Sequence, residues 1–421
     1  MKNILSALSL IILCSINISA GGQIIQRSGY IFTEITSKIS NMPSDSGNHY
    51  QEPTNMQMET WESTLDNMLL GNYSDASDSA NVIGYNLVNF TDTFDVLNVT
   101  YYILENAGSN YWGSYVYNPN FCRPLVIQSP HAKKDANTGH EGIHVFRKTQ
   151  AMFYQVNGTH RCNSSVYSTC TGTTAGCSST STSEAYRNSD MAHNIQSIFQ
   201  RTTEVLFYTF DNTYFIQLHG FTKQSTDPYV IVSNGTQETP PLDYMVSFTE
   251  NLYLEDTVLS FKIAHIDTAW TRLRGFWNTQ GRLINFSFSP CNMNAPIPSG
   301  RFFHVEQEKS RLRDDVTGWN KVANALNNTF TCIPLSIKGN TLQEKTKAYP
   351  NPTSHFISLE WEEDKGINLE KLVYNLLGQN LSKHVEVSNE KVGKAVLDLS
   401  QLPTGLYLIN FNKSTLKIYK N

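Results

Sequence analysis

The feature that most constrains the fold is a regular alternation of short apolar runs with longer amphipathic segments between residues 97 and 308. Six runs predict strands: VTYYIL (99–104), PLVIQS (124–129), TYFIQLHGF (213–221), SFKIAHI (260–266), RLINFSF (282–288) and RFFHVEQE (301–308). Residues 139–153 and 191–207 predict helices. Strands that alternate with helices are typical of α/β domains. We therefore expect residues 81–332 to form a mixed, mostly parallel sheet with flanking helices.

The N-terminal 20 residues have the composition of a secretory signal. Lys2 precedes an apolar run from Ile4 to Cys14, and Ile18-Ser19-Ala20 forms a small-residue cleavage site. No later stretch has the apolar length needed to cross a bilayer. Residues 21–80 are polar and weakly periodic, so we expect an irregular segment with one or two short helices, such as residues 61–70.

The charge and the cysteines narrow the class of protein. The net charge is −5 and no cluster of Lys and Arg forms a basic stripe, so binding to nucleic acid is not expected. Cysteines in an exported chain favour disulfides. The sequence has no C-x2-C pair, so a metal site made of cysteines is not expected. The sequence leaves open how six cysteines pair: Cys122, Cys162, Cys170, Cys177, Cys291 and Cys332.

After a polar linker at residues 333–347, residues 348–421 alternate apolar and polar residues over short runs, which predicts a small all-β sandwich. Four motifs lie there in order: YPNP (349–352), LVYNLLGQ (372–379), LDLSQLPTGLYLI (397–409) and KIYK (417–420). They resemble the C-terminal sorting domain of the Type IX secretion system of Bacteroidetes. The resemblance implies recognition by the secretion machinery and export through the periplasm and outer membrane, to the cell surface or the medium. The alternative is an adhesive or carbohydrate-binding β-module.

Histidines and a carboxylate occur where three of the predicted strands end. His131 follows LVIQS, His219 follows TYFIQL, and Glu306 lies in FFHVEQE. Ligand sites of open α/β sheets lie beyond the carboxyl ends of the strands. A catalytic zinc takes about three His, Asp or Glu ligands, keeps one position open and works with a nearby base. We therefore expect His131 and His219 to bind Zn²⁺, and we expect Glu306, a carboxylate in a buried strand, to be a general base with a raised pKa.

Neighbouring residues have simpler explanations as well. In TGHE, Thr138 and Glu141 match a capping box that needs no metal. Asp190 is a suitable N-cap for a helix that begins at Met191. His160 is either a polar residue at the end of a strand or a substrate contact.

A second resemblance covers roughly residues 122–320. PHAKKDANTGHEG, QLHGF and FFHVEQEKSRLR are similar to the strand-end His, His and Glu pattern of N-formylglutamate amidohydrolases, poly-γ-glutamate hydrolases and zinc carboxypeptidases. It implies a zinc-carboxypeptidase-like sheet, His131 and His219 as zinc ligands, and Glu306 as the base that helps water attack an amide. The chain departs from the H-x-x-E motif of carboxypeptidases because position 134 is Lys134. The third ligand would then be Asp135 or Glu141.

The segment TRLRGFWNTQGRLIN (271–285) gathers Arg272, Arg274 and Arg282. In an amidohydrolase, an arginine here would bind a substrate carboxylate through two parallel hydrogen bonds. The alternative is a solvated polar loop.

Taken together, the sequence predicts a secreted or cell-surface zinc-dependent hydrolase of small or peptide-like amides. Two alternatives remain open. One is a surface binding protein on a degenerate amidohydrolase-like scaffold, which would hold no stoichiometric zinc. The other is a metal-dependent polysaccharide esterase, which would need the same ligands but no arginine.

Overall fold

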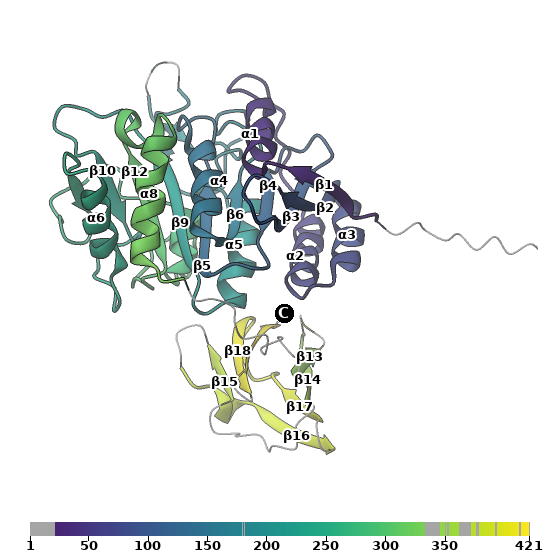
Figure 1. The fold of residues 1–421 in the computed structure, drawn as a ribbon. Helices are drawn as coiled ribbons and strands as arrows, with labels where there is room; N and C mark the ends of the chain where they lie inside the picture. Colours follow the sequence, from purple (N-terminus) through teal and green to yellow (C-terminus); the bar gives the residue numbers. More distant parts are fainter. Residues whose placement is uncertain are drawn as a thin grey trace, which may run out of the picture. The chain divides into compact units, whose positions relative to one another are not determined.

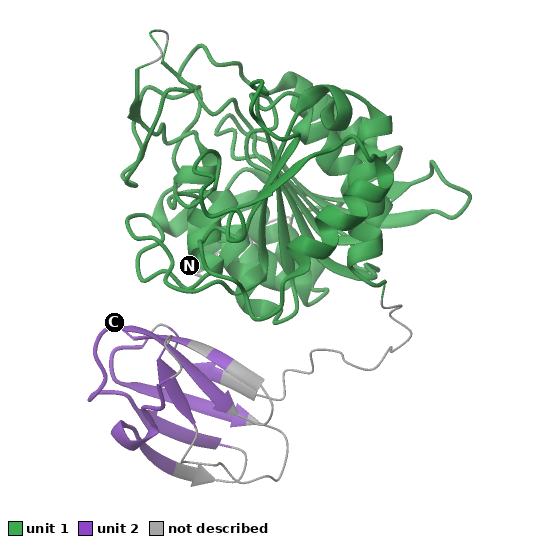
Figure 2. Ribbon diagram, turned by 90° about the vertical axis from the view of Figure 1, so that its left-hand side faces the viewer, with its two compact units in different colours: residues 1–335 green, residues 336–421 purple. Residues whose placement is uncertain are grey.

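The computed structural model describes residues 22–178, 180 and 182–332, followed by residues 346–349, 351, 353–361, 372–375, 379–391, 394–411 and 414–420. The chain divides into two compact units, residues 1–335 and residues 336–421 (Figure 2). The predicted secretory signal and most of the predicted linker lie outside the described residues. Among the described residues, no helix combines the length and the apolar character needed to cross a membrane.

Unit 1 contains most of the regular structure. Its strands are β1 (Ile25–Gly29), β2 (Tyr85–Asp92), β3 (Val99–Asn106), β4 (Ser114–Tyr117), β5 (Arg123–Ser129), β6 (Ala151–Val156), β7 (Thr173–Thr174), β8 (Glu184–Ala185), β9 (Tyr214–Gly220), β10 (Val230–Ser233), β11 (Phe261–Ile263) and β12 (Phe302–Gln307). Its helices are α1 (Ile31–Asn41), α2 (Asn55–Leu69), α3 (Tyr73–Val82), α4 (Thr138–Thr149), α5 (Ile198–Thr209), α6 (Tyr244–Glu255), α7 (Thr279–Ile284) and α8 (Val316–Thr329), with the short turns η1 (Met191–His193) and η2 (Lys309–Arg313).

A ten-stranded mixed sheet forms the centre of unit 1, in the order β1-β2-β3-β4-β6-β5-β9-β12-β10-β11. The central strands β6, β5, β9 and β12 run parallel to one another. Strand β1 is parallel to β2 and β10 to β11, whereas the other neighbours are antiparallel. The prediction of a mixed, mostly parallel sheet with flanking helices is therefore confirmed.

Helices cover both faces of this sheet. Residues of α1, α4, α6 and α8 form one apolar core with one face, and residues of α2, α3, α5 and α7 form a second core with the other. Figure 1 shows α4, α6 and α8 in front of the central strands. Successive side chains of a strand alternate between the two cores: on β5, Leu125 and Ile127 enter the first and Val126 enters the second. The central strands are apolar on both sides because both sides are covered.

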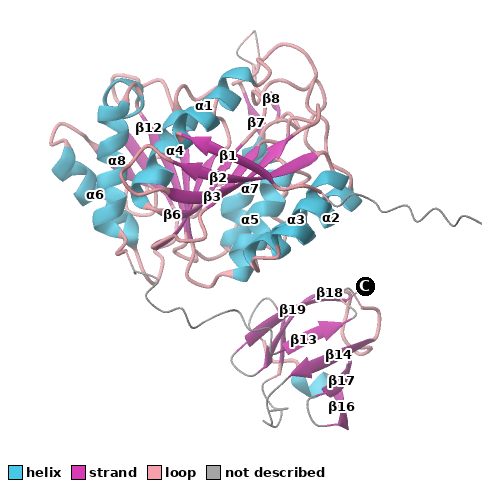
Figure 3. Cartoon of the chain, turned by 45° about the vertical axis from the view of Figure 1, so that its right-hand side comes forward, coloured by secondary structure: helices cyan, strands magenta, loops and turns pink. Residues whose placement is uncertain are grey.

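Several predictions about elements of unit 1 are wrong. The helix predicted at residues 139–153 ends at Thr149, because residues 151–156 form strand β6, and the helix predicted at residues 191–207 begins only at Ile198. The segment 21–80 contains the helix expected at residues 61–70, as part of α2, but it is more regular than predicted, since it also forms β1, α1 and α3 and contributes buried residues such as Ile35 and Trp61 to the two cores (Figure 3). RLINFSF is not a strand. Its first three residues belong to α7, which begins at Thr279 because the Asn278 side chain accepts a hydrogen bond from the Gly281 N–H and caps the helix.

The described residues of unit 2 form β-strands and one short 3-10 turn, η4 (Ser382–His384). One sheet contains β13 (Thr346–Tyr349), β14 (Phe356–Trp361), β17 (Lys394–Asp398) and β16 (Glu386–Lys391), and the other contains β15 (Val373–Asn375), β18 (Gly405–Phe411) and β19 (Ser414–Lys420). All pairings within the two sheets are antiparallel. Residues of both sheets, including Ile357 and Ile409, share one core. The expected small β-sandwich is therefore present.

Candidate metal centre

The carboxyl ends of β5, β9 and β12 bring the predicted site residues together. These strands are adjacent and parallel, so their carboxyl ends lie at one edge of the sheet. His219 and Glu306 are direct register partners on β9 and β12. His131 follows the last residue of β5 by two positions. Three residues far apart in the sequence thus reach one place because of the strand order.

Asp135 completes a group with His131 and His219 that has the donor types of a zinc site. One oxygen of Asp135, Oδ2, lies 3.2 Å from His131 Nδ1 and 3.3 Å from His219 Nδ1. Tetrahedral zinc with bonds of about 2.0–2.1 Å separates its ligand atoms by about 3.3–3.4 Å. All three residues are buried, and one ligand atom from each lies within 4.8 Å of the others. The two distances from Asp135 to the histidines are therefore of the size found between the ligand atoms of a small cation.

A buried amide network fixes the protonation of His219. The Gln217 side chain donates through Nε2 to Gln128 and Gln280, at 3.0 and 3.1 Å, so its oxygen is the acceptor. His219 Nε2 lies 2.8 Å from that oxygen and must carry the hydrogen. The lone pair is then on Nδ1, which faces Asp135. Burial, above all, lowers the pKa of His219 to about 4, so the ring is neutral at pH 7 and available as a ligand.

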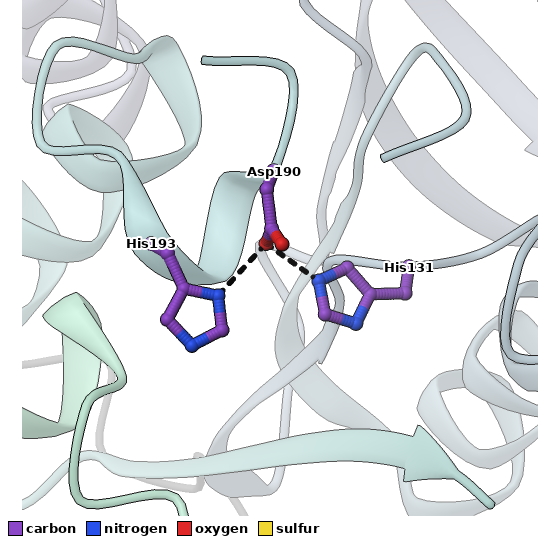
Figure 4. A group of neighbouring side chains, drawn as sticks. All are labelled: His131, Asp190 and His193. Atoms are coloured by element: carbon purple, nitrogen blue, oxygen red, sulfur yellow. Dashed lines mark hydrogen bonds and ion pairs between the residues drawn. The ribbon is translucent and has the colours of Figure 1, made fainter. Parts of the chain in front are cut away.

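His131 is oriented by a carboxylate in the same way. Its Nε2 lies 2.8 Å from Asp190 Oδ1, and Figure 4 shows Asp190 between the rings of His131 and His193. When the ring is neutral and Nε2 donates to Asp190, the lone pair is on Nδ1, which lies 3.4 Å from the Arg161 guanidinium. A histidine ligand that donates its other N–H to a carboxylate is the usual arrangement around zinc.

The sequence suggested that Asp190 caps a helix. In the structure its side chain contacts His131 instead. It precedes η1, but its side chain makes no capping bond. Helix α5 begins at Ile198 instead, where Ser197 caps it. Burial alone would raise the pKa of Asp190, yet the positive charge of Arg161, followed by His193 and His131, holds it well below its usual range. The contacts of Asp190 with His131 and His193 have hydrogen-bond distances, 2.8 and 3.0 Å, which fit a positioning role.

The two carboxylates beside His131 favour a positive charge there. Burial and Arg161 lower the pKa of this histidine, but Asp190 and Asp135 outweigh them and raise it. Asp135 also accepts a hydrogen bond of 3.2 Å from the Gly220 N–H. Two imidazole lone pairs directed at one carboxylate oxygen would repel it. A proton or a metal ion between them removes this repulsion.

Glu306 lies beside the group and has an unused oxygen. Among the described residues, its Oε2 has no hydrogen-bond partner, and Oε1 lies 3.9 Å from His304 Nε2. The His304 ring in turn stacks on His219, with 4.3 Å between the ring centres. Burial, followed by the charge of Asp135, raises the pKa of Glu306 to about 8. A carboxyl group that gains and loses its proton near neutral pH has the property required of a general base.

Glu141 is not brought to this group. It lies on α4 and accepts a 3.0 Å hydrogen bond from Gln307 Nε2, and Gln307 points to the opposite face of β12 from Glu306. The capping-box prediction is also wrong, because the N-cap of α4 is Asn137 and no side chain caps this helix. Of the two candidates for the third ligand, only Asp135 lies among the histidines.

Glu141 should instead make folding depend on pH. Burial, above all, raises its pKa from the usual 4.5 to about 8 in the folded chain. The folded state therefore binds a proton that the unfolded state releases, so this stabilisation is complete below pH 4.5 and lost as the pH rises to about 8. Glu141→Gln, which is neutral at every pH, should be more stable than the wild type at pH 9 by roughly 2–5 kcal/mol, since one pKa unit corresponds to about 1.4 kcal/mol.

The measurement is urea unfolding at pH 5, 7 and 9, with zinc content determined on the same samples. Glu59→Gln, at an exposed position of α2, serves as the control and should leave the wild-type pH curve unchanged. Parallel pH curves for Glu141→Gln and the wild type would contradict the buried neutral carboxyl. Loss of zinc in Glu141→Gln would make this residue a ligand after all.

A cavity of about 400 Å³ opens beside the histidines. Residues 271 and 273–277 line the cavity, together with His131, Asp135, His219, His304 and Glu306. Gly275 permits the close approach of this loop, because its φ is +65° and a Cβ atom there would lie 2.7 Å from the His304 ring.

The predicted substrate-binding residues separate into different places. Arg274 lines the cavity. Arg272 forms an ion pair with Asp227 at 2.5 Å and does not line it. Arg282 is buried, and its hydrogen bonds go to oxygens of the surrounding loops. His160 also lies outside the cavity lining, and its Nδ1 accepts a 3.2 Å hydrogen bond from the Cys162 N–H.

The sequence interpretation missed Arg161, His193 and Tyr186, which also line the cavity. They lie between β6 and α5, where the described residues form long loops with the short strands β7 and β8 and the turn η1, which ends at His193 (Figure 3). Disulfides fasten these loops: Cys162–Cys177 begins directly after Arg161, and Cys170–Cys291 ties them to the loop after α7. The third disulfide, Cys122–Cys332, joins the start of β5 to the end of unit 1. The six cysteines are therefore paired, and cysteine spacing was the one signal that these loops would be ordered.

Comparison with known proteins identifies only the C-terminal part of the chain. Residues 347–421 match the family model described as secretion system C-terminal sorting domain. No curated protein matches this chain. The matched segment covers the β-sandwich of unit 2 and contains the four sorting motifs. The chain thus carries a C-terminal sorting domain of the Type IX kind, which indicates export to the outer membrane or the medium.

Proposed function

We propose that residues 22–332 form a zinc-dependent, carboxypeptidase-like hydrolase of amide or peptide-like bonds that acts at the cell surface or in the medium. The observation that carries the proposal is the convergence of two histidine Nδ1 atoms on Asp135 Oδ2, at 3.2 and 3.3 Å. The export signal supports the location.

His131, Asp135 and His219 would hold the zinc. When bound, zinc supplies a Lewis acid that polarises a carbonyl group and lowers the pKa of water to about 7. Asp190 and Gln217 hold the two imidazole rings so that the Nδ1 atoms face the ion.

Glu306 would move the proton. Its Oε2 accepts the proton of the attacking water and later delivers it to the nitrogen of the leaving amine. Arg274 lines the cavity, and the structure shows no carboxylate bonded to it among the described residues, so its guanidinium is available for a carboxylate of the substrate. An available arginine favours an amide that bears a carboxylate over a neutral polysaccharide ester.

The test is elemental analysis of the purified full chain together with a panel of amides: N-formyl-, N-acetyl- and γ-glutamyl-amino acids, and a peptide. We expect about one zinc per chain, hydrolysis of at least one amide, and loss of that activity with a chelator. A chain without stoichiometric zinc would support the surface binding protein instead. Zinc with hydrolysis of acetylated polysaccharide, and of no amide, would support the esterase.

Export can be tested separately. Deletion of residues 348–421 removes the segment matched by the sorting-domain model, so the truncated chain should accumulate in the periplasm. Fractionation of cells with detection by antibody measures this. Deletion of residues 25–29, strand β1 at the edge of the sheet in unit 1, is the control. If this variant folds, it should still be exported. Surface delivery of the chain without residues 348–421 would contradict the prediction.

A further inference from the structure

Trp277 is an aromatic residue that lines the same cavity as the histidines and Glu306 but remains 47% exposed. An exposed tryptophan is common on protein surfaces and needs no explanation by itself. Trp277 differs because it lies beside the buried histidines and Glu306, and because one face of its ring packs against a buried side chain.

The support below the ring is Arg282. The centre of the Arg282 guanidinium lies 4.9 Å from the centre of the Trp277 ring, and Arg282 is 1% exposed. Its N–H groups donate to the carbonyl oxygens of Phe276, Pro290 and Cys291 and to the Asn294 side chain, at 2.7 to 3.3 Å. A cation held by four oxygens below an aromatic face fixes the position of that face.

A second ring extends the surface toward the metal centre. A Cβ atom on Gly172 would lie 2.5 Å from the Tyr186 ring and 3.3 Å from the Trp277 ring, so both rings pack on this glycine. Tyr186 stacks on His193 with 3.7 Å between ring centres, and His193 contacts Asp190. The disulfide Cys170–Cys291 joins the loop of Gly172 to the carbonyls that hold Arg282. The aromatic side of the cavity is therefore built in advance, with little side-chain entropy left to lose on binding.

We propose that Trp277 is a ring-binding subsite, in which a flat apolar ring face of the substrate, from an aromatic side chain or a pyranose, stacks on the exposed indole. The placement of the scissile bond beside His131, Asp135 and His219 rests on the proposed function. The binding of the ring requires neither zinc nor turnover. An aromatic stack contributes a factor of roughly 3 to 10 in affinity.

The test uses four small probes with the full chain: N-acetyl-L-phenylalaninamide, N-acetyl-D-glucosamine, N-acetyl-L-alaninamide as the ringless reference, and N-acetylglycinamide. Ligand-observed NMR titration gives the dissociation constants. We expect at least one ring probe to bind more tightly than the ringless probes, and Trp277→Ala to weaken that probe roughly 3- to 10-fold. Trp277→Phe should restore most of the loss. The ring probe that responds identifies which kind of ring the subsite takes.

Trp270→Ala is the matched control. Trp270 lies in the same loop and donates to the Arg272 carbonyl, but it does not line the cavity. It should leave ring binding unchanged. Equal binding of ring and ringless probes, absence of ring binding, or equal binding by Trp277→Ala and the wild type would overturn the subsite.

The same titration on the His131→Ala/His219→Ala variant separates this inference from the proposed function. Ring binding should persist in this variant, because it requires neither zinc nor turnover. Intact ring binding in a wild-type chain that holds no zinc and cleaves no amide would contradict the hydrolase and leave the subsite standing. A zinc-containing, active chain with no effect of Trp277→Ala would contradict the subsite alone.

Discussion

Replacement of His131 or His219 by alanine is expected to remove stoichiometric zinc and amide hydrolysis together. Each substitution deletes one of the three proposed ligands, and the two distances from Asp135 to the histidines are close to the ligand spacing of a tetrahedral ion. Loss of one outer hydrogen bond around a metal costs 10- to 100-fold in affinity, so loss of a ligand should cost more than about 100-fold. Zinc titration with a competing chelator measures this, and activity is followed in parallel.

The matched control is His265→Ala. His265 is buried like His131 and His219 and also contacts a carboxylate, with Nε2 2.8 Å from Asp243 Oδ2, but it does not line the cavity. This variant should keep its zinc. Asp135→Asn should behave like the histidine variants, whereas Asp190→Asn should lose about 10- to 100-fold in affinity because it only orients His131. Stoichiometric zinc in the His131→Ala/His219→Ala double variant would exclude this metal centre.

The sequence predicted the strands of this site well because their apolar runs are short, uninterrupted and followed at once by polar residues. His131, His219 and Glu306 could be grouped on that basis, since parallel strands share an edge. The prediction could not choose between Asp135 and Glu141. The choice depends on whether the chain after β5 turns back before α4 begins, and the Asp135 N–H does bond to the His131 carbonyl. In this turn Asp135 contacts His219 and Gly220 of β9, which are far away in the sequence and could not be paired with it from the local pattern.

The rest of the site could not be predicted because its residues lack a periodic pattern. Arg161 and His193 lie in loops whose path is set by disulfides and by the buried charge of Asp190. In contrast, the N-terminal segment does carry a helical pattern of apolar residues. Met58, Trp61, Leu65 and Met68 are buried on one side of α2 at helical spacing, although polar residues surround them.

Replacement of Glu306 by glutamine should separate proton transfer from metal binding. Glutamine has nearly the same shape but cannot accept the proton of the attacking water. The variant should therefore retain zinc and lose roughly 10²-fold or more in kcat, the usual scale for a general base. Metal content and single-turnover hydrolysis on one preparation measure the two quantities.

Glu308→Gln is the control that makes the result specific to position. Glu308 lies two residues further along, but its carboxylate accepts hydrogen bonds from the Ser310 and Arg311 N–H groups and caps η2. Its loss should cost at most about 1 kcal/mol of stability and leave kcat unchanged. His219, His304 and Glu306 also form a group that could hold a metal ion. If Glu306→Gln loses its zinc, Glu306 is a ligand in that group, and the base must be sought elsewhere. If Glu306→Gln retains zinc but hydrolyses slowly, Glu306 is the group that accepts the proton, since its carboxylate, with the unpartnered Oε2, is what the substitution removes.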